Sequence, residues 1–323
     1  MYRKISAILI PTAIAVGILA YMLFRVWNDL VIALQNSIPA YLVLGTLICL
    51  SAWWLRGWRY HTILSNLNYR VSITASAACI FVSQSVNLII PARLGDFVRI
   101  FILKHDYNST YSEGVSSLVV ERIFDLFTVA LLGAVAIFFV LNAPPWFYTI
   151  IVFPIVAGVV FFTLLLFMGK FSSENRYIAI VLTILHEIKR ASLSSKAIVL
   201  LGFSSGIIWF VDILVCVTVV MMFQQQIPFA IIVLAIVIGN LVKAVPLTPG
   251  GVGTYEISLA ITFGLAGVDP AAATLIAIID HLIKNLVTVA GGIISIYYFG
   301  DWVIPSIRTA LDSKLGGGDR PVR

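Results

Sequence analysis

The stretch "NLVKAVPLTPGGVGTYE", residues 240–256, interrupts a long apolar region with two prolines, three glycines, a lysine and a glutamate. A helix needs about 20 apolar residues to cross the hydrocarbon core of a bilayer, and the apolar run on each side of the stretch is shorter. Proline and glycine stop helices, so the backbone must leave the helix here. Irregular backbone occurs at membrane depth only where protein or a water-filled cavity surrounds it. The stretch therefore predicts a broken helix beside a polar site.

The composition of the chain indicates a polytopic membrane protein. Its 323 residues are 60% hydrophobic and only 11% charged, with a mean hydropathy of +1.03, whereas soluble domains contain about 25% charged residues. The net charge of +6 would suit nucleic acid, but the bases flank apolar runs, so no nucleic-acid partner is expected. Cys49, Cys79 and Cys216 lie far apart in apolar runs, without the spacing of a metal site, and no metal or cofactor is expected.

The apolar runs predict an all-α polytopic membrane protein with six transmembrane helices and two re-entrant broken-helix hairpins in an inverted repeat. The hairpins are expected at 73–104 and 229–266, where a proline–glycine motif interrupts each apolar region and leaves halves too short to span. The six expected spans are residues 5–24, 38–58, 114–140, 147–169, 197–222 and 271–298.

Lysine and arginine gather on one side of this topology. With the N-terminus inside, sixteen basic residues fall in cytoplasmic segments, Arg56, Arg59 and Arg99 among them, and only Arg25 falls outside. The positive-inside rule then places both termini in the cytoplasm and the protein in the cell membrane. Residues 175–196 are expected to form an amphipathic helix on the cytoplasmic surface.

A weak internal repeat supports the inverted arrangement. "PARLG" (91–95) and "PGGVG" (249–253) share the form P-x-x-[LV]-G, and at nearly the same distance beyond them come "ERIFD" (121–125) and "DHLIK" (280–284). Inverted repeats with broken helices are typical of secondary transporters. We expect one transmembrane domain over 1–323. Its parts are an N-terminal helix and external loop (1–37), repeat 1 (38–140), a linking helix and cytoplasmic amphipathic segment (141–196), repeat 2 (197–299) and a cytoplasmic tail (300–323).

Ten charged residues fall in the apolar or broken segments, and His281 is a further candidate base. The acids are Asp96, Glu121, Asp125, Asp212, Glu256 and Asp280, and the bases are Arg93, Arg122, Lys243 and Lys284. A charge at the centre of a span costs roughly 2.5–3.5 kcal/mol, so these groups must be paired or hydrated. Asp280 and Lys284 are spaced to pair on a helix. Two interpretations stay open: buried ion pairs that hold the repeats together, or a polar cavity whose excess of acids suits a zwitterionic or cationic headgroup as well as a phosphate.

The glycine-rich break also predicts an anion site. A break frees backbone N–H groups at the start of the next half-helix, where the helix dipole favours an anion such as phosphate. "PGGVG" is flanked by Lys243 and Glu256, and Arg93 at the opposite break is suited to hold phosphate bidentately. A plain turn would explain the glycines but not these charges.

Three enzyme motifs are either absent or out of context. "GFSSG" (202–206) matches G-x-S-x-G but lies in an apolar helix, where its two glycines favour close helix packing instead. The sequence contains neither G-x-x-x-x-G-K-[ST] nor H-E-x-x-H. No catalytic residue is assigned, and the chain is not expected to be an enzyme.

Three stretches together resemble the signatures of the lysylphosphatidylglycerol synthase transmembrane-region family: "NLIIPARLGD" (87–96), "ERIFD" (121–125) and "PLTPGGVGTYE" (246–256). Asp96 stands where the family usually has Glu, which keeps the charge. In bifunctional members this membrane domain flips the lipid that a soluble aminoacyl-transfer domain makes. The resemblance implies a stand-alone flippase-like member without that soluble domain. Other relatives occur with polyprenyl- or dolichol-phosphate sugar pathways, beside glycosyltransferases.

We therefore expect a lipid flippase that moves a phosphate-containing headgroup, of a polyprenyl-phosphate sugar or an aminoacylated phospholipid, through a polar cavity between the repeats. The expected partners are that lipid and a separate glycosyltransferase or lipid-modifying synthase. The alternatives are a non-transporting scaffold for a glycosyltransferase and an intramembrane glycosyl- or acyltransferase. The sequence leaves the oligomeric state open. The candidate substrate-binding residues are Asn87, Pro91, Arg93, Gly95, Asp96, Glu121, Arg122, Asp125, Asn240, Lys243, Pro249, Gly250, Gly251, Gly253, Glu256, Asp280, His281 and Lys284.

Overall fold

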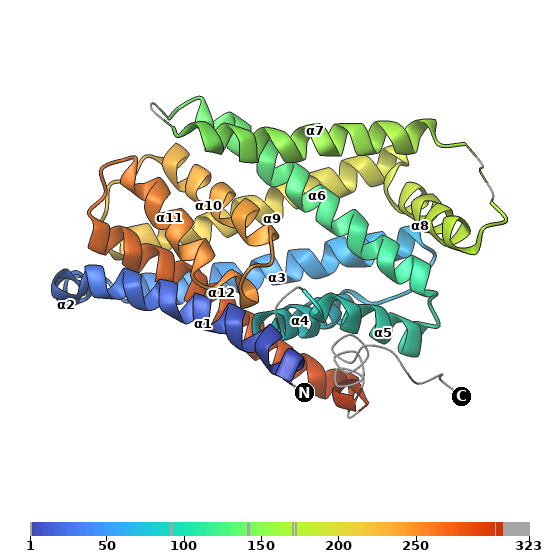
Figure 1. Cartoon of the computed structure of the whole chain (residues 1–323), viewed down its shortest axis with the longest axis horizontal. Coiled ribbons are helices and arrows are strands. Elements are labelled where there is room, and N and C mark those ends of the chain that lie inside the picture. The colour runs from blue at the N-terminus through green and yellow to red at the C-terminus, as the bar shows by residue number, and fades with distance from the viewer. Residues whose placement is uncertain are drawn as a thin grey trace.

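Helices joined by short turns make up the part of the chain that the computed structural model describes, residues 2–90, 93–140, 143–169, 171, 173–300 and 302–305 (Figure 1). No strand occurs within these ranges, which confirms the all-α fold. The helices are α1 (Tyr2–Arg25), α2 (Trp27–Gln35), α3 (Ala40–Asn66), α4 (Ile73–Ile89), α5 (Gly95–Tyr107), α6 (Tyr111–Ile137), α7 (Pro145–Phe167), α8 (Arg176–Ser192), α9 (Ser195–Met222), α10 (Phe229–Ala244), the 3₁₀ turn η1 (Pro249–Gly251), α11 (Thr254–Gly264) and α12 (Pro270–Phe299).

Four helices are long and apolar enough to cross a membrane by length and composition alone: α3, α7, α9 and α12. Helix α6 has 27 residues but carries Glu121, Arg122 and Asp125 near its middle. In α1, the segment Thr12–Arg25 is apolar. A multi-pass membrane protein follows from these helices, whereas the number of spans stays a prediction.

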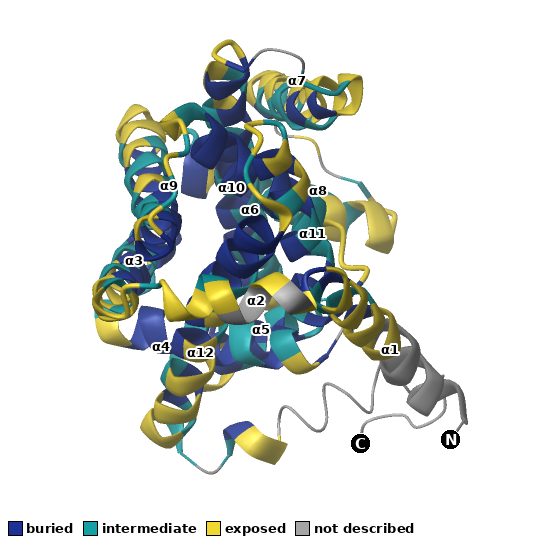
Figure 2. Cartoon of the chain, turned by 90° about the vertical axis from the view of Figure 1, so that its left-hand side faces the viewer, coloured by how far each residue is buried: buried dark blue, intermediate teal, exposed yellow. Residues whose placement is uncertain are grey.

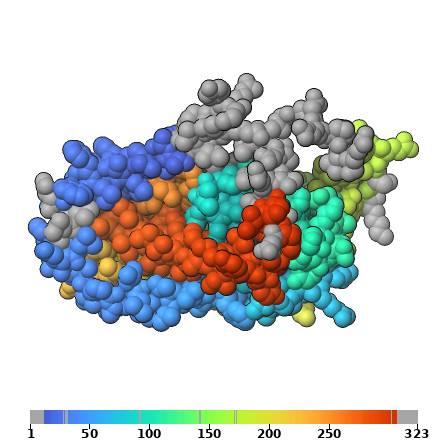
Figure 3. All heavy atoms as spheres, turned by 90° about the horizontal axis from the view of Figure 1, so that it is seen from below, coloured from blue at the N-terminus to red at the C-terminus, as the bar shows by residue number. Residues whose placement is uncertain are grey.

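The N-terminal region contains one helix that the sequence did not predict. Residues expected to form an external loop contain α2, which packs against α12. Asp29 lies in its first turn, where a carboxylate stabilises the positive end of the helix dipole. Seen from below, α1 and α12 lie on the same face as the α4–α5 region (Figure 3).

The first predicted break lies between α4 and α5, which fold back on each other as hairpin 1. The Asn87 side chain spans the turn: its Oδ1 accepts from the Gly95 N–H at 2.7 Å, and its Nδ2 donates to Asp96 at 3.0 Å. A Cβ on Gly95 would lie 2.2 Å from the Ser83 carbonyl oxygen, so only glycine permits this contact. Pro91, which was expected at the tip of the turn, lies outside the described residues.

The second predicted break separates α10 from α11 and forms hairpin 2. Gly250, Gly251 and Gly253 have φ values of 61°, 78° and 84°, which glycine adopts without the steric penalty of a Cβ. The Glu256 carboxylate accepts from the Gly253 N–H at 2.7 Å and so caps the start of α11. The motif therefore ends one helix and starts another.

The helices of the two predicted repeats pack against each other reciprocally. Helix α3 lies along α9, α4 of hairpin 1 packs on α12, and α10 of hairpin 2 packs on α6. Glycines permit both hairpin contacts, since a Cβ on Gly292 would overlap Ser85 and one on Gly133 would overlap Val237. Close packing was also expected at Gly202 and Gly206 of α9, and within the described ranges this is wrong: no described heavy atom outside the helix lies within 4 Å of either Cβ position.

Helices α7 and α8 lie outside this core, as Figures 1 and 2 show. Helix α7 exposes Phe153 and Leu164 and buries few side chains, an outer surface suited to lipid. The predicted amphipathic helix forms as α8 and packs against α6, and its Lys189 ammonium donates to the Met168 carbonyl at 2.8 Å.

Candidate functional site

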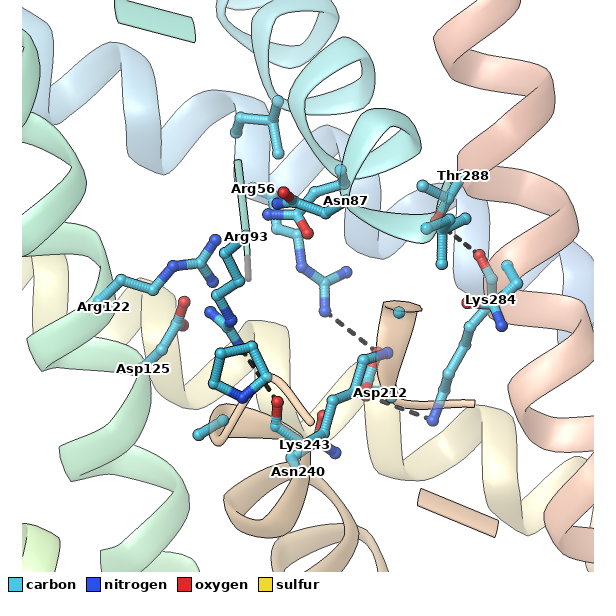
Figure 4. A pocket seen from close by; sticks show the side chains of 18 of the residues that line it. Arg56, Asn87, Arg93, Arg122, Asp125, Asp212, Asn240, Lys243, Lys284 and Thr288 are labelled. Atoms are coloured by element: carbon cyan, nitrogen blue, oxygen red, sulfur yellow. Dashed lines mark hydrogen bonds and ion pairs between the residues drawn. The ribbon is translucent and has the colours of Figure 1, made fainter. Parts of the chain in front are cut away.

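A cavity of about 400 Å³ lies where the two helix breaks meet (Figure 4). Its walls come from α3, α4, α6, α9, α10, η1 and α12, so both repeats contribute. The Leu88 side chain of hairpin 1 packs against Gly250 of hairpin 2, and Arg93 Nη2 donates to the Lys243 carbonyl oxygen at 3.4 Å. The volume lies within the range of about 300–1,000 Å³ that is usual for small-ligand sites.

More than half of the candidate residues line this cavity. They are Asn87, Arg93, Glu121, Arg122, Asp125, Asn240, Lys243, Gly250, Gly251 and Lys284. The others in the described chain form no part of the lining. They are Gly95, Asp96, Pro249, Gly253, Glu256, Asp280 and His281. Several of these hold a lining residue in place, as Asp96 does for Arg122 at 3.4 Å.

A first group of charges, the α6 cluster, consists of Glu121, Asp125 and the arginines that bind them. Asp125 receives both terminal nitrogens of Arg59, at 2.6 and 3.0 Å. Glu121 pairs with Arg99 and lies 3.7 Å from Arg59. Trp209 donates its indole N–H to Asp125 at 3.1 Å. Bidentate guanidinium–carboxylate contacts are among the strongest side-chain pairs and fix the orientation of both partners.

The two arginines of the α6 cluster lie inside the protein, which the sequence analysis did not predict. Arg59 and Arg99 were assigned to cytoplasmic segments, yet they are 1% and 0% exposed. Arg56, assigned in the same way, lines the cavity. Helix α3 continues to Asn66, so Arg59 lies within the helix beyond the expected end of the span at residue 58, and Arg56 lies inside that expected span. Arg99 lies within α5, the second half of hairpin 1, and not at its end.

A second group, the α12 cluster, is centred on Lys284. Its ammonium lies 2.9 Å from Asp280 and 3.3 Å from Asp212, which confirms the predicted Asp280–Lys284 pair. Asp212 also binds Arg56 at 3.1 Å, and the Tyr255 hydroxyl donates to Asp280 at 2.7 Å. Asp212 was counted among the buried acids but not as a site residue. A lone acid within a long apolar helix was the signal available for it.

Lys243 belongs to a chain of three polar side chains at hairpin 2. Its ammonium lies 3.0 Å from Nε2 of His281, and Nδ1 of His281 lies 2.7 Å from Glu256 Oε1. His281 and Glu256 are both buried. An ammonium that donates to Nε2 requires the proton on Nδ1, which then donates to the carboxylate. The chain therefore orients Lys243 without an ion pair to it.

Arg93 and Lys243 differ from the other cations of the cavity. Within the described ranges, neither side chain has a carboxylate oxygen within 4.0 Å, whereas Arg56, Arg122 and Lys284 each have one. Arg93 also has a φ of 54°, a left-handed conformation that is uncommon for a residue with a Cβ. Two cations thus lie beside the glycine break without a carboxylate partner in the described chain.

The charge balance of the cavity also differs from the expected excess of acids. Three of the six acids lie outside the lining, and Arg56 joins the bases, so the lining is net basic. Its bases are Arg56, Arg93, Arg122, Lys243 and Lys284, and its acids are Glu121, Asp125 and Asp212. This lining favours an anionic group.

The cavity is bordered by exposed apolar residues at both breaks. In hairpin 1, Ile89 is 70% exposed between the lining residues Leu88 and Ile90. In hairpin 2, Val245 and Leu247 are likewise exposed and alternate with lining residues. A polar cavity and an apolar surface therefore meet at the same two segments, which is the combination that an amphiphile requires.

Comparison with known proteins gives a family and several relatives. A family model described as the lysylphosphatidylglycerol synthase TM region matches residues 8–292. Glycosyltransferase AglD of Haloferax volcanii is 30% identical over 367 residues, covering 98% of this chain and 58% of that protein, so the chain spans little more than half of AglD. A UPF0104 membrane protein of Methanocaldococcus jannaschii is 26% identical over 66% of this chain and 93% of its own. Another, from Methanothermobacter thermautotrophicus, is 24% identical over 84% of this chain and 89% of its own.

Proposed function

The chain belongs to the family of the lysylphosphatidylglycerol synthase transmembrane region, and from this membership and its charged cavity we propose that it moves the headgroup of a phosphate-containing lipid across the membrane. The lipid is a polyprenyl-phosphate sugar or an aminoacylated phospholipid. In this proposal the protein lies in the cell membrane with both termini in the cytoplasm, and a separate glycosyltransferase or lipid-modifying synthase works beside it.

The observation that carries the proposal is the pair Arg93 and Lys243. Both side chains are half-buried, and a cation partly removed from water without a carboxylate partner carries a cost that a bound anion would offset. Arg93 presents a planar fork of donors and Lys243 a point charge, the two forms in which proteins commonly bind phosphate. Gly250 and Gly251 line the cavity beside them and allow a phosphate to approach the backbone.

The surroundings of the cavity support a lipid as the bearer of this phosphate. The exposed residues Ile89, Val245 and Leu247 offer a path for the lipid chain along the breaks, while the headgroup occupies the polar interior. The reciprocal packing of each hairpin on the other repeat supports an inverted repeat, in which alternate access arises by rocking one repeat against the other.

A second candidate is a non-transporting scaffold for a glycosyltransferase, and the name of AglD gives it some support. The paired charges of the α6 and α12 clusters would suit a purely structural role. Arg93 and Lys243 suit it less well, because within the described ranges neither forms an ion pair, and they link helices through hydrogen bonds to the Lys243 carbonyl oxygen and to His281. An intramembrane transferase is the third candidate, and product formation by the purified protein from lipid and sugar donor would identify it.

The test is headgroup translocation in vesicles that contain the purified protein. Short-chain prenyl-phosphate lipid is added with and without a sugar, and a membrane-impermeant reagent reports which headgroups remain outside. Arg93→Ala and Lys243→Ala are expected to lower the rate at least tenfold. The matched controls are Arg70→Ala and Lys196→Ala, whose side chains are exposed. Unchanged rates in both cavity variants would contradict the proposal and favour the scaffold.

A further inference from the structure

We infer that the headgroup is a phosphate joined to an uncharged sugar, rather than to a cationic amino acid. The inference rests on the proposed function and selects between its two lipid classes. It comes from the partners of the lining residues: each carboxylate of the cavity is already paired with a base, whereas several neutral amides are uncommitted.

A cationic headgroup would need a carboxylate, and none of the three in the lining is free. Asp125 is bound by both terminal nitrogens of Arg59, and Glu121 by Arg99. Asp212 lies between Arg56 and Lys284, at 3.1 and 3.3 Å. A headgroup ammonium would therefore have to compete for these carboxylates with the bases that already hold them, and displacing a base would leave it without its partner. With its excess of bases, the lining also repels a further cation.

In contrast to the carboxylates, most neutral amides in the lining keep unused hydrogen-bonding groups. Gln84 of α4 and Asn285 of α12 line the cavity, and their side-chain amides make no hydrogen bond to any described residue. Asn240 uses its Nδ2 to donate to the Ile236 carbonyl at 2.8 Å and leaves its Oδ1 unbonded. Asn87, by contrast, is committed on both sides to the turn of hairpin 1. An amide offers a donor and an acceptor, which matches a hydroxyl group of a sugar.

These amides extend the anion site toward the contact between α4 and α12. Those two helices pack closely here, since the Ser85 hydroxyl donates to the Thr288 carbonyl at 2.8 Å. In Figure 4, Thr288 and Lys284 lie on one side of Arg93, and Arg122 and Asp125 lie on the other. A phosphate between Arg93 and Lys243 therefore has neutral donors and acceptors on its α12 side.

Aromatic side chains complete this lining. Trp209 and Trp53 both border the cavity. The Trp209 N–H is satisfied by Asp125, which fixes the indole in place and leaves its apolar ring for contact. An amphipathic ring held in this way suits the apolar C–H face of a sugar, whose hydroxyls then turn to the amides.

The test is a comparison of affinities for the purified chain in nanodiscs. The probes are a short-chain isoprenyl phosphate hexose, the same isoprenyl phosphate without sugar, lysylphosphatidylglycerol and soluble hexose 1-phosphate. The glycosylated lipid is expected to bind at least tenfold more tightly than each of the other three. Gln84→Leu and Asn285→Leu are each expected to weaken binding of that probe about fivefold, the effect of one net hydrogen bond. They should leave the unglycosylated lipid unchanged, as should the exposed control Gln226→Leu with both lipids.

A gain-of-binding variant tests the same inference in the other direction. Asn285→Asp places a carboxylate in the lining and is expected to raise the affinity for lysylphosphatidylglycerol at least fivefold. Tighter binding of lysylphosphatidylglycerol than of the glycosylated lipid in the unaltered protein would overturn the inference. Equal affinity for the lipids with and without sugar would overturn it too, while Arg93-dependent binding of both would leave the proposed function standing. Arg93-independent binding of every probe would contradict the proposed function itself, and equally tight binding of hexose 1-phosphate would refute a lipid-linked source.

Discussion

The charged segment of α6 and that of α12 hold equivalent places in the two predicted repeats, yet they stabilise their charges by different means. The same spacing along the chain separates Glu121 from Asp280 and Asp125 from Lys284. The α6 carboxylates are held by guanidinium groups from α3 and α5, which stay charged at any physiological pH. On α12 the partners are lysine and tyrosine, whose protons are more readily shared.

This difference assigns different tasks to the two segments. The α6 cluster fixes α3, α5 and α6 relative to one another through charge-assisted pairs that cannot be neutralised by losing a proton from arginine. The polar groups of α12 reach hairpin 2 through Tyr255 and through the chain from Glu256 to His281 and Lys243. One segment therefore holds the structure, and the other is connected to a cation that faces the cavity.

The largest effect is expected from Glu121→Gln. The substitution removes the only carboxylate paired with Arg99 in the described chain, and a buried charge without its partner costs about 3–5 kcal/mol. We expect the free energy of unfolding, measured by denaturant titration in mixed micelles, to fall by that amount. Glu187→Gln, in the surface pair with Arg190, is the matched control and should cost less than about 0.5 kcal/mol. A loss of transport at unchanged stability would instead make Glu121 a headgroup ligand, and the contrast between the two segments would fail.

A second comparison sets the close contact at Gly95 in hairpin 1 against the open position of Gly202 on α9, with Gly95→Ala as its test. Hairpin 1 depends on a contact so close that a Cβ on Gly95 would lie 2.2 Å from backbone. Moving the two helices of the hairpin apart would break the hydrogen bonds of Asn87. Gly95→Ala is therefore expected to lower the free energy of unfolding by about 1–3 kcal/mol. Gly202→Ala places the same methyl group in open space and should be neutral or slightly stabilising. The same unfolding titration measures both, and equal effects would show that the turn adjusts freely.

The sequence predicted both breaks because proline and glycine act locally, and the structure has them at "PARLG" and "PGGVG". It also predicted the pair Asp280–Lys284, which one helical turn determines. It could not predict the partners of Glu121 and Asp125, because Arg59 and Arg99 come from other helices. The pairing of Arg56 with Asp212 was missed for the same reason, because Asp212 comes from α9. Gln84 and Asn285 carry no signal in the sequence at all, since only the packing of α4 on α12 brings them to one cavity.

A smaller effect is expected from Asp280→Asn in the α12 cluster. Lys284 keeps Asp212 at 3.3 Å after the substitution, so no base is left unpaired. Asp280 Oδ1 also has no hydrogen-bond partner in the described chain, and the new amide therefore breaks few bonds. We expect a loss of about 1–2 kcal/mol in the unfolding titration, less than for Glu121→Gln. The exposed Glu174→Gln serves as control. A cost as large as that of Glu121→Gln would mean that the two clusters are equally rigid.

The smallest effect concerns the start of α6, outside its expected span. Burial raises the pKa of Glu113, but hydrogen bonds from Tyr69 at 2.5 Å and from Thr110 outweigh this and lower it below the ordinary value of 4.5. The start of α12 differs, because Asp269 caps it through backbone N–H groups alone.

A carboxylate whose pKa is lowered on folding stabilises the fold fully above its ordinary pKa, and the contribution is lost as the pH falls through the folded pKa. Glu113→Gln is therefore expected to lower the free energy of unfolding slightly at pH 7, by less than about 1 kcal/mol, because the side chain is partly exposed. The difference from the unaltered protein should shrink below about pH 4. The exposed Glu174→Gln should show no difference at either pH. A deficit for Glu113→Gln that persisted unchanged at low pH would mean that its contribution is packing against Tyr69 and not charge, and the two helix starts would then be alike.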